Sequence, residues 1–184
     1  MKIEKATPAD LDAIMYIVAQ AQASLGALGI DQWQDGYPSR DIISGDIERG
    51  VGYVVRAEVG TEADDEVGAE AGDEVSAVVA TAHISFDGEV TYEKIFGGEW
   101  LSDGPYAVIH RIAVADSARK LGVAGFIVES VCERCKKMGL TSIKIDTHEG
   151  NSPMRAFLTK SGFKQCGTIY LTNGDSRIAY ELIV

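Results

Sequence analysis

The chain has 184 residues, 46% hydrophobic and 24% charged, which is typical of a soluble globular protein. We expect residues 1–184 to form a single domain with a substantial core. No apolar run approaches the roughly 18 residues of a membrane span, and the start at Met1 lacks an apolar signal core, so we expect a cytoplasmic protein with no membrane partner. The net charge of −11 argues against a nucleic-acid partner, because such binding depends on basic patches.

Charge is distributed unevenly along the chain. Residues 1–110 hold 6 Lys/Arg and 21 Asp/Glu, net −15, whereas residues 111–184 hold 11 and 7, net +4. An acidic first half can attract a cationic substrate, although solubility alone also explains it. Glu58–Glu74 has eight acids, no base and no periodicity, so we predict a mobile acidic hairpin loop at about residues 60–74.

The first half is predicted to hold two helices and two strands. Thr7 caps the first helix, whose apolar positions recur at helical spacing up to Leu25, and we expect it to end before Gly26. A loop with exposed aromatic residues follows. We expect the second helix at residues 41–50 and the two strands at 52–59 and 75–86. A long connection follows at residues 87–105, and we expect it to wall a pocket.

The second half runs strand, helix, strand, helix and hairpin. An apolar strand, Tyr106–Val114, leads into a helix that starts near Val123 and ends near Met138. Within this helix Cys132 and Cys135 form a C-x-x-C pair far from the N-terminus, so we favour packing over redox or metal chemistry and predict no metal site. The following strand, helix and hairpin span residues 141–147, 151–161 and 167–184.

The turn before the helix at Val123 predicts an anion site. A helix start presents free N–H groups and partial positive charge, and Gly122, Ala124 and Gly125 let a ligand approach the main chain. Arg119 and Lys120 add two full charges. The residues alone therefore predict a cradle for a phosphate or pyrophosphate, and other phosphate-loop motifs are absent from the sequence.

Arg119-Lys120-Leu121-Gly122-Val123-Ala124 fits the acyl-CoA motif R/Q-x-x-G-x-G/A, and Ile112-Ala113-Val114 fits the strand before it. Asn151, Ala156 and Gly162-Phe163 fit the second motif of the same family. The chain thus resembles the GNAT acyltransferases, in particular a bacterial subgroup of unassigned substrate. The resemblance implies an α/β (α+β) fold: a mixed, mostly antiparallel central sheet, flanked by helices and splayed between the fourth and fifth strands.

The resemblance also implies acetyl-CoA, or coenzyme A, as the cofactor. The pantetheine arm is expected in the gap between the splayed strands, and the pyrophosphate on the amides before the helix, with Asn151 contacting the cofactor from the other side. The implied cofactor-binding residues are Ile112, Ala113, Val114, Arg119, Lys120, Leu121, Gly122, Val123, Ala124, Gly125 and Asn151.

The implied activity is N-acetyl transfer to a small-molecule amine, by direct attack of the amine on the thioester. His110 is the candidate general base, because its unperturbed pKa of about 6.5 suits neutral pH. His83 and Glu99 are alternatives, and a hydrogen-bonded structural histidine remains open for His110. Strand alternation predicts that Arg111 faces the opposite side, unless a bulge interrupts the strand.

The sequence departs from the family where a proton donor is expected. Many relatives carry a tyrosine at the position of Leu158, which cannot donate a proton, so Tyr170, Ser161 or water would have to replace it. This departure keeps open a second function, a non-catalytic CoA-binding sensor or interaction module. A protein acetyltransferase is a third hypothesis, which the connection at 87–105 disfavours by narrowing the site.

Loop aromatics and their neighbours are the candidates for the acceptor pocket. Trp33, Gln34, Tyr37, His83 and Trp100 are predicted to bind the substrate, because aromatic residues stack on cationic or ring-bearing acceptors. Core packing, or a contact in a homodimer, explains the aromatics equally well.

Overall fold

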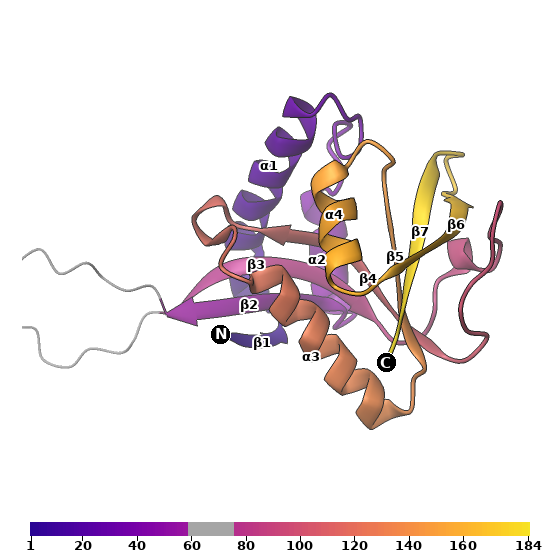
Figure 1. Ribbon diagram of the computed structural model, residues 1–184. Coiled ribbons are helices and arrows are strands. Elements are labelled where there is room, and N and C mark those ends of the chain that lie inside the picture. Colours follow the sequence, from indigo (N-terminus) through magenta and orange to yellow (C-terminus); the bar gives the residue numbers. More distant parts are fainter. Residues whose placement is uncertain (59–75) are drawn as a thin grey trace, which may run out of the picture.

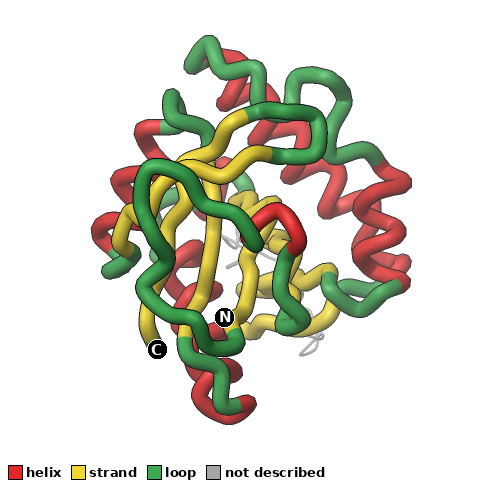
Figure 2. The backbone as a smooth tube through the Cα atoms, turned by 90° about the vertical axis from the view of Figure 1, so that its right-hand side faces the viewer, coloured by secondary structure: helices red, strands yellow, loops and turns green. Residues whose placement is uncertain are grey.

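The computed structural model describes residues 1–58 and 76–184, and the acidic loop predicted at 60–74 lies outside these residues. The described residues form seven strands and four α-helices (Figures 1 and 2). None of these helices is both long and apolar enough to cross a membrane. The strands are β1 (Lys2–Lys5), β2 (Gly52–Glu58), β3 (Ser76–Ser85), β4 (Tyr106–Val114), β5 (Ser142–Thr147), β6 (Lys164–Tyr170) and β7 (Ser176–Ile183), and the helices are α1 (Leu11–Ala27), α2 (Arg40–Glu48), α3 (Val123–Met138) and α4 (Ser152–Lys160).

The strands form one sheet in the order β1-β2-β3-β4-β5-β7-β6. All neighbouring strands are antiparallel except β4 and β5, which are parallel. These two strands pair at only three positions, from Tyr106 opposite Ser142 to Val108 opposite Lys144. The predicted fold, a mostly antiparallel sheet that splays between its fourth and fifth strands, is confirmed.

The sheet separates two apolar layers, because successive side chains of a strand point to opposite faces. Leu158 of α4 and Ile143 of β5 belong to a large cluster that also contains the buried side of α3, and Figure 1 shows α3 and α4 in front of the sheet. On the other face, α1 and α2 pack with Val54 of β2. The segment 87–105 covers Val108 of β4 on that same face.

The start of α1 agrees with the prediction at Thr7, but its end does not. Gly26 lies inside the helix. The chain leaves α1 at Gly29, which has a left-handed φ of 70°, and the amides of Gly29 and Ile30 donate to the carbonyls of Gly26 and Leu25. These two bonds are the usual way a helix ends on a left-handed glycine, so Gly29 is the stop residue.

Candidate functional site

The turn between β4 and α3 presents consecutive backbone amides. Lys120 and Gly122 both have left-handed backbone angles, with φ of 64° and 81°, and α3 begins directly after them. The Leu121 amide is 3.4 Å from the Ala118 carbonyl, whereas the amides of residues 122–125 donate to no other residue that the structure describes. Such a row of free amides at a helix start binds anions.

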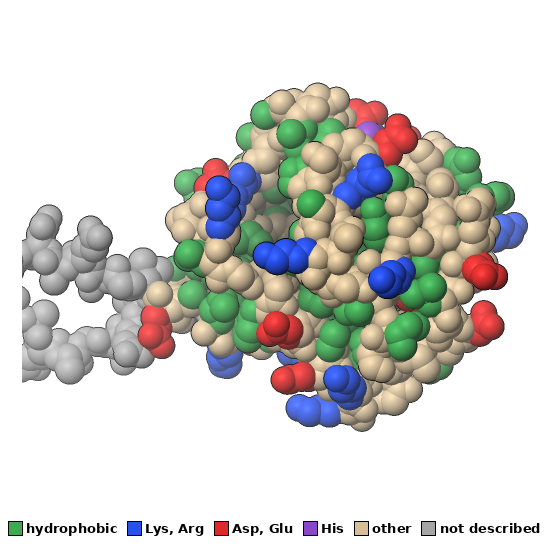
Figure 3. Space-filling model, in the orientation of Figure 1, with side chains coloured by type: hydrophobic (Ala, Val, Ile, Leu, Met, Phe, Trp, Pro, Cys, Tyr) green, Lys and Arg blue, Asp and Glu red, His purple; other side chains and the backbone are tan. Residues whose placement is uncertain are grey.

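The surface over this turn is open. A Cβ atom added to Gly122 or Gly125 would meet no other atom within 4 Å, so a ligand can reach the main chain. Figure 3 shows Lys and Arg side chains around a hollow between this turn and α4. Free amides, open space and nearby positive charge fit the pyrophosphate of the expected cofactor.

The two basic side chains of the turn have different surroundings. The Arg119 guanidinium donates to Ser24 Oγ of α1 and pairs with Asp116, both at 2.7 Å, so it anchors the turn to α1. Lys120 is exposed and forms no ion pair with another described residue. Lys120 is therefore the cation of the turn that remains available for a ligand.

Beyond Val108, β4 pairs with no other strand of the described residues on the side that faces β5. Ile112, Ala113 and Val114 lie in this part of the strand, and the last two pair with β3 on the other side. The unpaired edge offers main-chain groups to an extended ligand. Pairing of these three residues with the pantetheine arm stays a prediction.

Residues near α4 account for two further expectations. The Asn151 side chain caps α4 by accepting the Met154 amide at 3.2 Å, and its contact with the cofactor stays a prediction. Leu158 is fully buried in the core, so the expected tyrosine position holds no proton donor. Tyr170 lies on β6, and β7 separates it from β5 and the gap.

His110 lies where β4 and β5 separate, between two carboxylates. Its Nε2 is 3.3 Å from Glu89 Oε2, and its Nδ1 is 3.5 Å from Asp146 Oδ1. The hydrogen bond with His110 is the main reason that the pKa of Glu89 falls to about 2, against the opposite effect of burial. His110 is therefore held beside the gap with a carboxylate next to each ring nitrogen.

A bulge in β4 brings Arg111 to the same cluster as His110. Arg111 has a φ of 52°, and the pairing with β3 shifts between Thr81 and His83. The Arg111 guanidinium is 2.7 Å from Nδ1 of His83, whose ring centre lies 5.6 Å from that of His110. The prediction that Arg111 faces away from His110 is wrong, because the extra residue breaks the alternation.

Asp46 of α2 neutralises Arg111. Its Oδ2 accepts from Arg111 Nη2 at 2.6 Å and from Nε at 3.1 Å, while its Oδ1 is 3.2 Å from His83 Nδ1. Burial acts to raise the pKa of Asp46, but the hydrogen bond with His83 and the charge of Arg111 outweigh it and lower the pKa. This buried pair ties α2 to the bulge beside His110.

Three of the predicted acceptor residues lie on the α1 side of this cluster. The Tyr37 hydroxyl accepts from Arg111 Nη1 at 2.6 Å, and the Tyr37 ring packs edge-on against Trp33. Gln34 instead donates to the Gln22 carbonyl of α1 at 3.0 Å. Tyr37 is thus connected to the His83 cluster through Arg111, whereas Gln34 is tied to α1.

Trp100 lies on the opposite side of His110, behind Tyr92. Its Nε1 donates to the Tyr92 carbonyl at 2.9 Å, and the Tyr92 ring packs against both Trp100 and His110. The ammonium of Lys144, whose pKa is lowered by burial, lies 4.2 Å from the centre of the Trp100 ring. The structure therefore places Trp100 as a support for Tyr92. Its contact with an acceptor stays a prediction.

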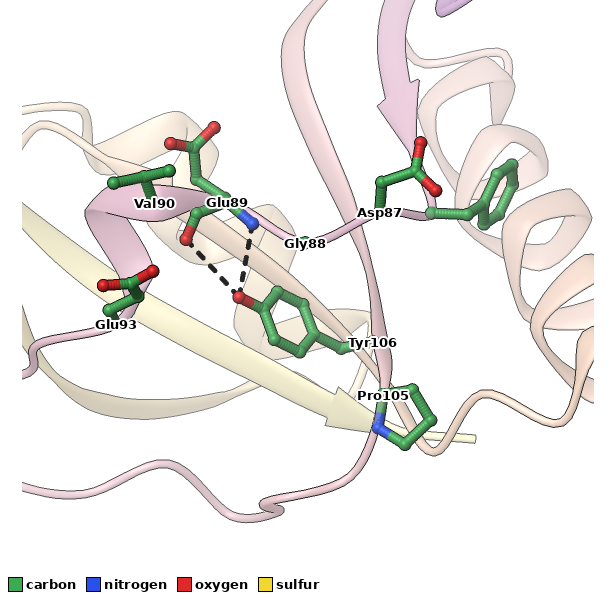
Figure 4. Close-up of a pocket in the computed structure, with 8 residues that line it drawn as sticks. Asp87, Gly88, Glu89, Val90, Glu93, Pro105 and Tyr106 are labelled. Carbon is green, nitrogen blue, oxygen red and sulfur yellow. Dashed lines mark hydrogen bonds between the residues drawn. The ribbon is translucent and has the colours of Figure 1, made fainter.

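A hollow of about 470 Å³ lies beside Glu89 (Figure 4). The Glu89 amide and carbonyl both meet the Tyr106 hydroxyl, at 3.3 and 3.5 Å, which fixes the main chain at this point. The hollow combines three carboxylates with apolar walls, a lining that suits an organic cation. It is formed by Phe86, Asp87, Gly88, Glu89, Val90, Glu93, Pro105 and Tyr106.

Cys132 and Cys135 take part in packing, as predicted. Cys135 is fully buried, and burial raises the pKa of its thiol to about 11. Burial raises the pKa of Cys132 as well. Within residues 1–58 and 76–184, no group of three or more metal-ligating side chains comes together.

Four side chains of the cluster were not predicted: Asp46, Glu89, Tyr92 and Asp146. The signal for Asp146 was present, because a carboxylate in a strand with inward isoleucines must face the other side of the sheet. Glu89 and Tyr92 lie in a connection without periodicity, which gives no local signal. In the sequence, Asp46 looks like a residue on the polar face of an amphipathic helix, which gives no sign of a buried role.

Comparison with known proteins identifies the family. The model of the acetyltransferase (GNAT) family matches residues 31–163. A GNAT acetyltransferase from Streptococcus agalactiae is 31% identical, with 100% of this chain and 95% of that chain covered and a TM-score of 0.79. A GNAT acetyltransferase from Listeria monocytogenes (17% identity, 100% and 94% covered, TM-score 0.69) and a ribosomal-protein-alanine N-acetyltransferase from Brucella melitensis (18%, 100% and 100%, 0.63) share the fold. The chain therefore belongs to the GNAT family of acetyltransferases, whose members use acetyl-CoA as the acyl donor.

Proposed function

We propose that this protein acetylates a small-molecule amine, with His110 as the general base and with both substrates bound at once. One observation carries the proposal: His110 lies at the point where β4 and β5 part, and the same strand ends at the open turn before α3. A proton acceptor and an anion cradle on one strand can align an amine with an acyl donor.

The chain's own residues would hold the donor at two places. The free amides of residues 122–125, together with Lys120, would bind the pyrophosphate, and the unpaired edge of β4 at residues 112–114 would pair with the pantetheine arm. Acetyl-CoA supplies the thioester that the amine attacks. An amide of this edge, near Ile112, would stabilise the negative charge that develops on the thioester oxygen.

The acceptor would approach from the side of Glu89. An amine is mostly an ammonium at neutral pH, and the hollow beside Glu89 also carries Asp87 and Glu93, which attract cations. His110 would then take the proton that the ammonium must lose before it can attack. Because Leu158 is buried and apolar, water is the proposed carrier that takes the second proton lost by the nitrogen as the amide forms and passes a proton to the leaving thiolate.

A small acceptor is favoured over a peptide by the segment 87–105. Tyr92 of this segment is buried in a cluster with Val108 of β4, and Trp100 packs against the Tyr92 ring, so the segment lies against the sheet beside His110. A backbone bridge from Phe96 to Thr168 fixes the segment to β6 as well. A peptide groove beside His110 would require this packing to open.

Binding and turnover test the proposal separately. At 100-fold over its Kd, acetyl-CoA should add about 2.7 kcal/mol of stability, a rise in Tm of roughly 5 to 10 °C for a chain of this length. Thiol release should then be measured with mono- and diamines, amino acids, aromatic amines and a short peptide. The absence of a thermal shift would refute the cofactor assignment, and turnover with the peptide alone would refute a small-molecule acceptor.

Replacing His110 distinguishes an enzyme from a binding module. His110→Ala should keep the thermal shift and lose roughly 10²- to 10⁴-fold in rate. His148→Ala is the matched control, because His148 only accepts a loop amide and lies near exposed Asp31. If wild type binds acetyl-CoA but acetylates nothing in the panel, the non-catalytic module becomes the better function.

A further inference from the structure

Asp146 and His110 face each other across the gap between β4 and β5. Their strands pair in parallel up to Val108 and Lys144, and His110 and Asp146 each lie two residues further along. The two side chains therefore lie at the same level on the same face, with Nδ1 and Oδ1 3.5 Å apart. A side-chain contact takes over where backbone pairing has ended.

Tyr92 makes the Asp146 side chain a hydrogen-bond acceptor. Its hydroxyl donates to Asp146 Oδ1 at 2.6 Å, the same oxygen that faces His110. Tyr92 is only 2% exposed, and burial, together with the charge of Asp146, raises the pKa of the phenol. Tyr92 therefore keeps its proton and donates it, so the Asp146 oxygen can only accept.

The other ring nitrogen of His110 faces a more accessible carboxylate. Glu89 Oε2 is 3.3 Å from Nε2, while Glu89 Oε1 accepts from the amide and the hydroxyl of Thr91 at 3.1 and 3.0 Å. The Glu89 side chain is 29% exposed, against 9% for Asp146. A substrate can therefore reach the ring on the Nε2 side, and Asp146 lies on the closed side.

A neutral His110 has one ring proton, and Glu89 on the Nε2 side and Asp146 on the Nδ1 side compete to accept it. We propose that Asp146 is a positioning residue that holds this proton on Nδ1 once the substrate ammonium pairs with Glu89, and so leaves the lone pair on Nε2 for that ammonium. The inference rests on the proposed function, since it gives His110 its orientation as the base. Two further described neighbours of the ring are Tyr92, which keeps its proton, and His83, which is held by Asp46 and Arg111.

One proton moves from the substrate ammonium to His110 and then to solvent. Nε2 takes one proton from the ammonium, which leaves a neutral amine and an imidazolium, and the imidazolium later returns the proton to solvent. The cation lies between the Asp146 and Glu89 carboxylates while it exists. Before transfer, Glu89 can pair with the ammonium itself, because both occupy the Nε2 side of the ring.

Imidazole ¹⁵N NMR tests the proton position without acetyl-CoA or turnover. The sequence has three histidines, and the His110→Ala and His148→Ala spectra identify their signals. In Glu89→Gln at high pH, whose amide can donate to Nε2 as an ammonium would, neutral His110 should carry its proton on Nδ1. Adding Asp146→Asn, whose amide can also donate to the ring, should move the proton to Nε2 or divide it between the two nitrogens. A proton on Nε2 in Glu89→Gln, or a spectrum that the added Asp146→Asn does not change, would overturn the proposal even if the enzyme is active.

Kinetics on an accepted amine supply the second readout. Asp146→Asn should lower kcat roughly 10- to 100-fold with little change in KM, and Tyr92→Phe, which removes only the anchor of Asp146, should give a smaller loss. In the His110→Ala background, Asp146→Asn should cost nothing further, because the two residues act as a unit. If the losses multiply instead, Asp146 has a structural role only. If no protein turns over, the proposed function fails while the NMR result still decides the orientation of His110.

Discussion

The turn before α3 and the cluster around His110 lie on the same strand, but they are built differently. The turn offers backbone amides of consecutive residues and the open space over Gly122 and Gly125. The cluster assembles side chains from α2, from β3 and β4, from β5 and from the segment 87–105. A backbone surface depends on local conformation, whereas a side-chain cluster depends on the packing of the whole domain. Changes at the turn should therefore alter affinity, and changes in the cluster should alter stability and pH dependence.

The largest effect is expected in the cluster, at Asp46. Asp46→Asn keeps the shape of the side chain but leaves the Arg111 guanidinium, which is 14% exposed, without its anion. Removal of one partner from a buried ion pair costs about 3 kcal/mol or more. Urea unfolding at pH 7 should show this loss in the free energy of unfolding.

Asp12→Asn is the matched control for this prediction. Asp12 also pairs with an arginine, Arg40, at 2.6 Å, but its side chain is 87% exposed. Exposed pairs contribute little, so the loss should stay within about 0.5 kcal/mol. If Asp46→Asn and Asp12→Asn lower the free energy of unfolding equally, burial does not make the Asp46–Arg111 pair more stabilising than an exposed pair.

At the turn, Gly125→Glu should weaken acetyl-CoA binding roughly 100-fold, because a carboxylate would lie beside the pyrophosphate. The fold should tolerate the change, since a Cβ at Gly125 meets open space and Glu is a better helix former than Gly. Titration calorimetry gives the affinity, and thermal unfolding without ligand gives the stability.

Gly125→Gln separates bulk from charge at the turn. Gln has the size of Glu, so the difference between the two variants measures repulsion, and it should shrink as salt is raised. If Gly125→Glu binds acetyl-CoA as wild type does, the pyrophosphate does not bind at this turn. If Gly125→Glu lowers stability but leaves the affinity for acetyl-CoA unchanged, the turn behaves as we expect of the His110 cluster, and the contrast between the two regions fails.

The difference in construction also explains which parts could be predicted. The turn and the element order were predictable because both follow from residues close together in the sequence, such as Gly122 and the helix after it. Strand alternation predicts the wrong side of the sheet for Arg111, because a single extra residue in β4 shifts the pairing with β3 and turns the side chain. Nothing near Arg111 in the sequence marks that bulge.

The partners of His110 were missed for a different reason. Glu89 and Asp146 come from segments on either side of it in the sequence, and only the sheet order brings them together. Spacing rules describe one helix or one strand, so they do not report contacts between elements. The sequence does single out His110, because it lies in the apolar strand that leads into the motif of the turn.

The smallest effect on stability is expected at Glu89, and its dependence on pH distinguishes it from the effects of other residues. The pKa of Glu89 is lowered from 4.5 to about 2 in the folded protein, chiefly by its hydrogen bond with His110. A lowered folded pKa means that the contribution to stability is fully present above about pH 4.5 and is lost as the pH falls toward 2. Glu89→Gln should therefore cost up to about 2 kcal/mol near neutral pH, allowing for partial exposure, and progressively less in acid.

Urea unfolding of wild type and Glu89→Gln at several pH values between 7 and 3 checks this behaviour. Glu93→Gln is the control, because Glu93 borders the same hollow but is exposed and does not touch His110. In the His110→Ala background the loss caused by Glu89→Gln should be small at every pH, since the main cause of the lowered pKa is gone. A difference that stays constant from pH 7 to 3 would mean that Glu89 contributes through packing, and the cluster would then resemble the turn in its indifference to pH.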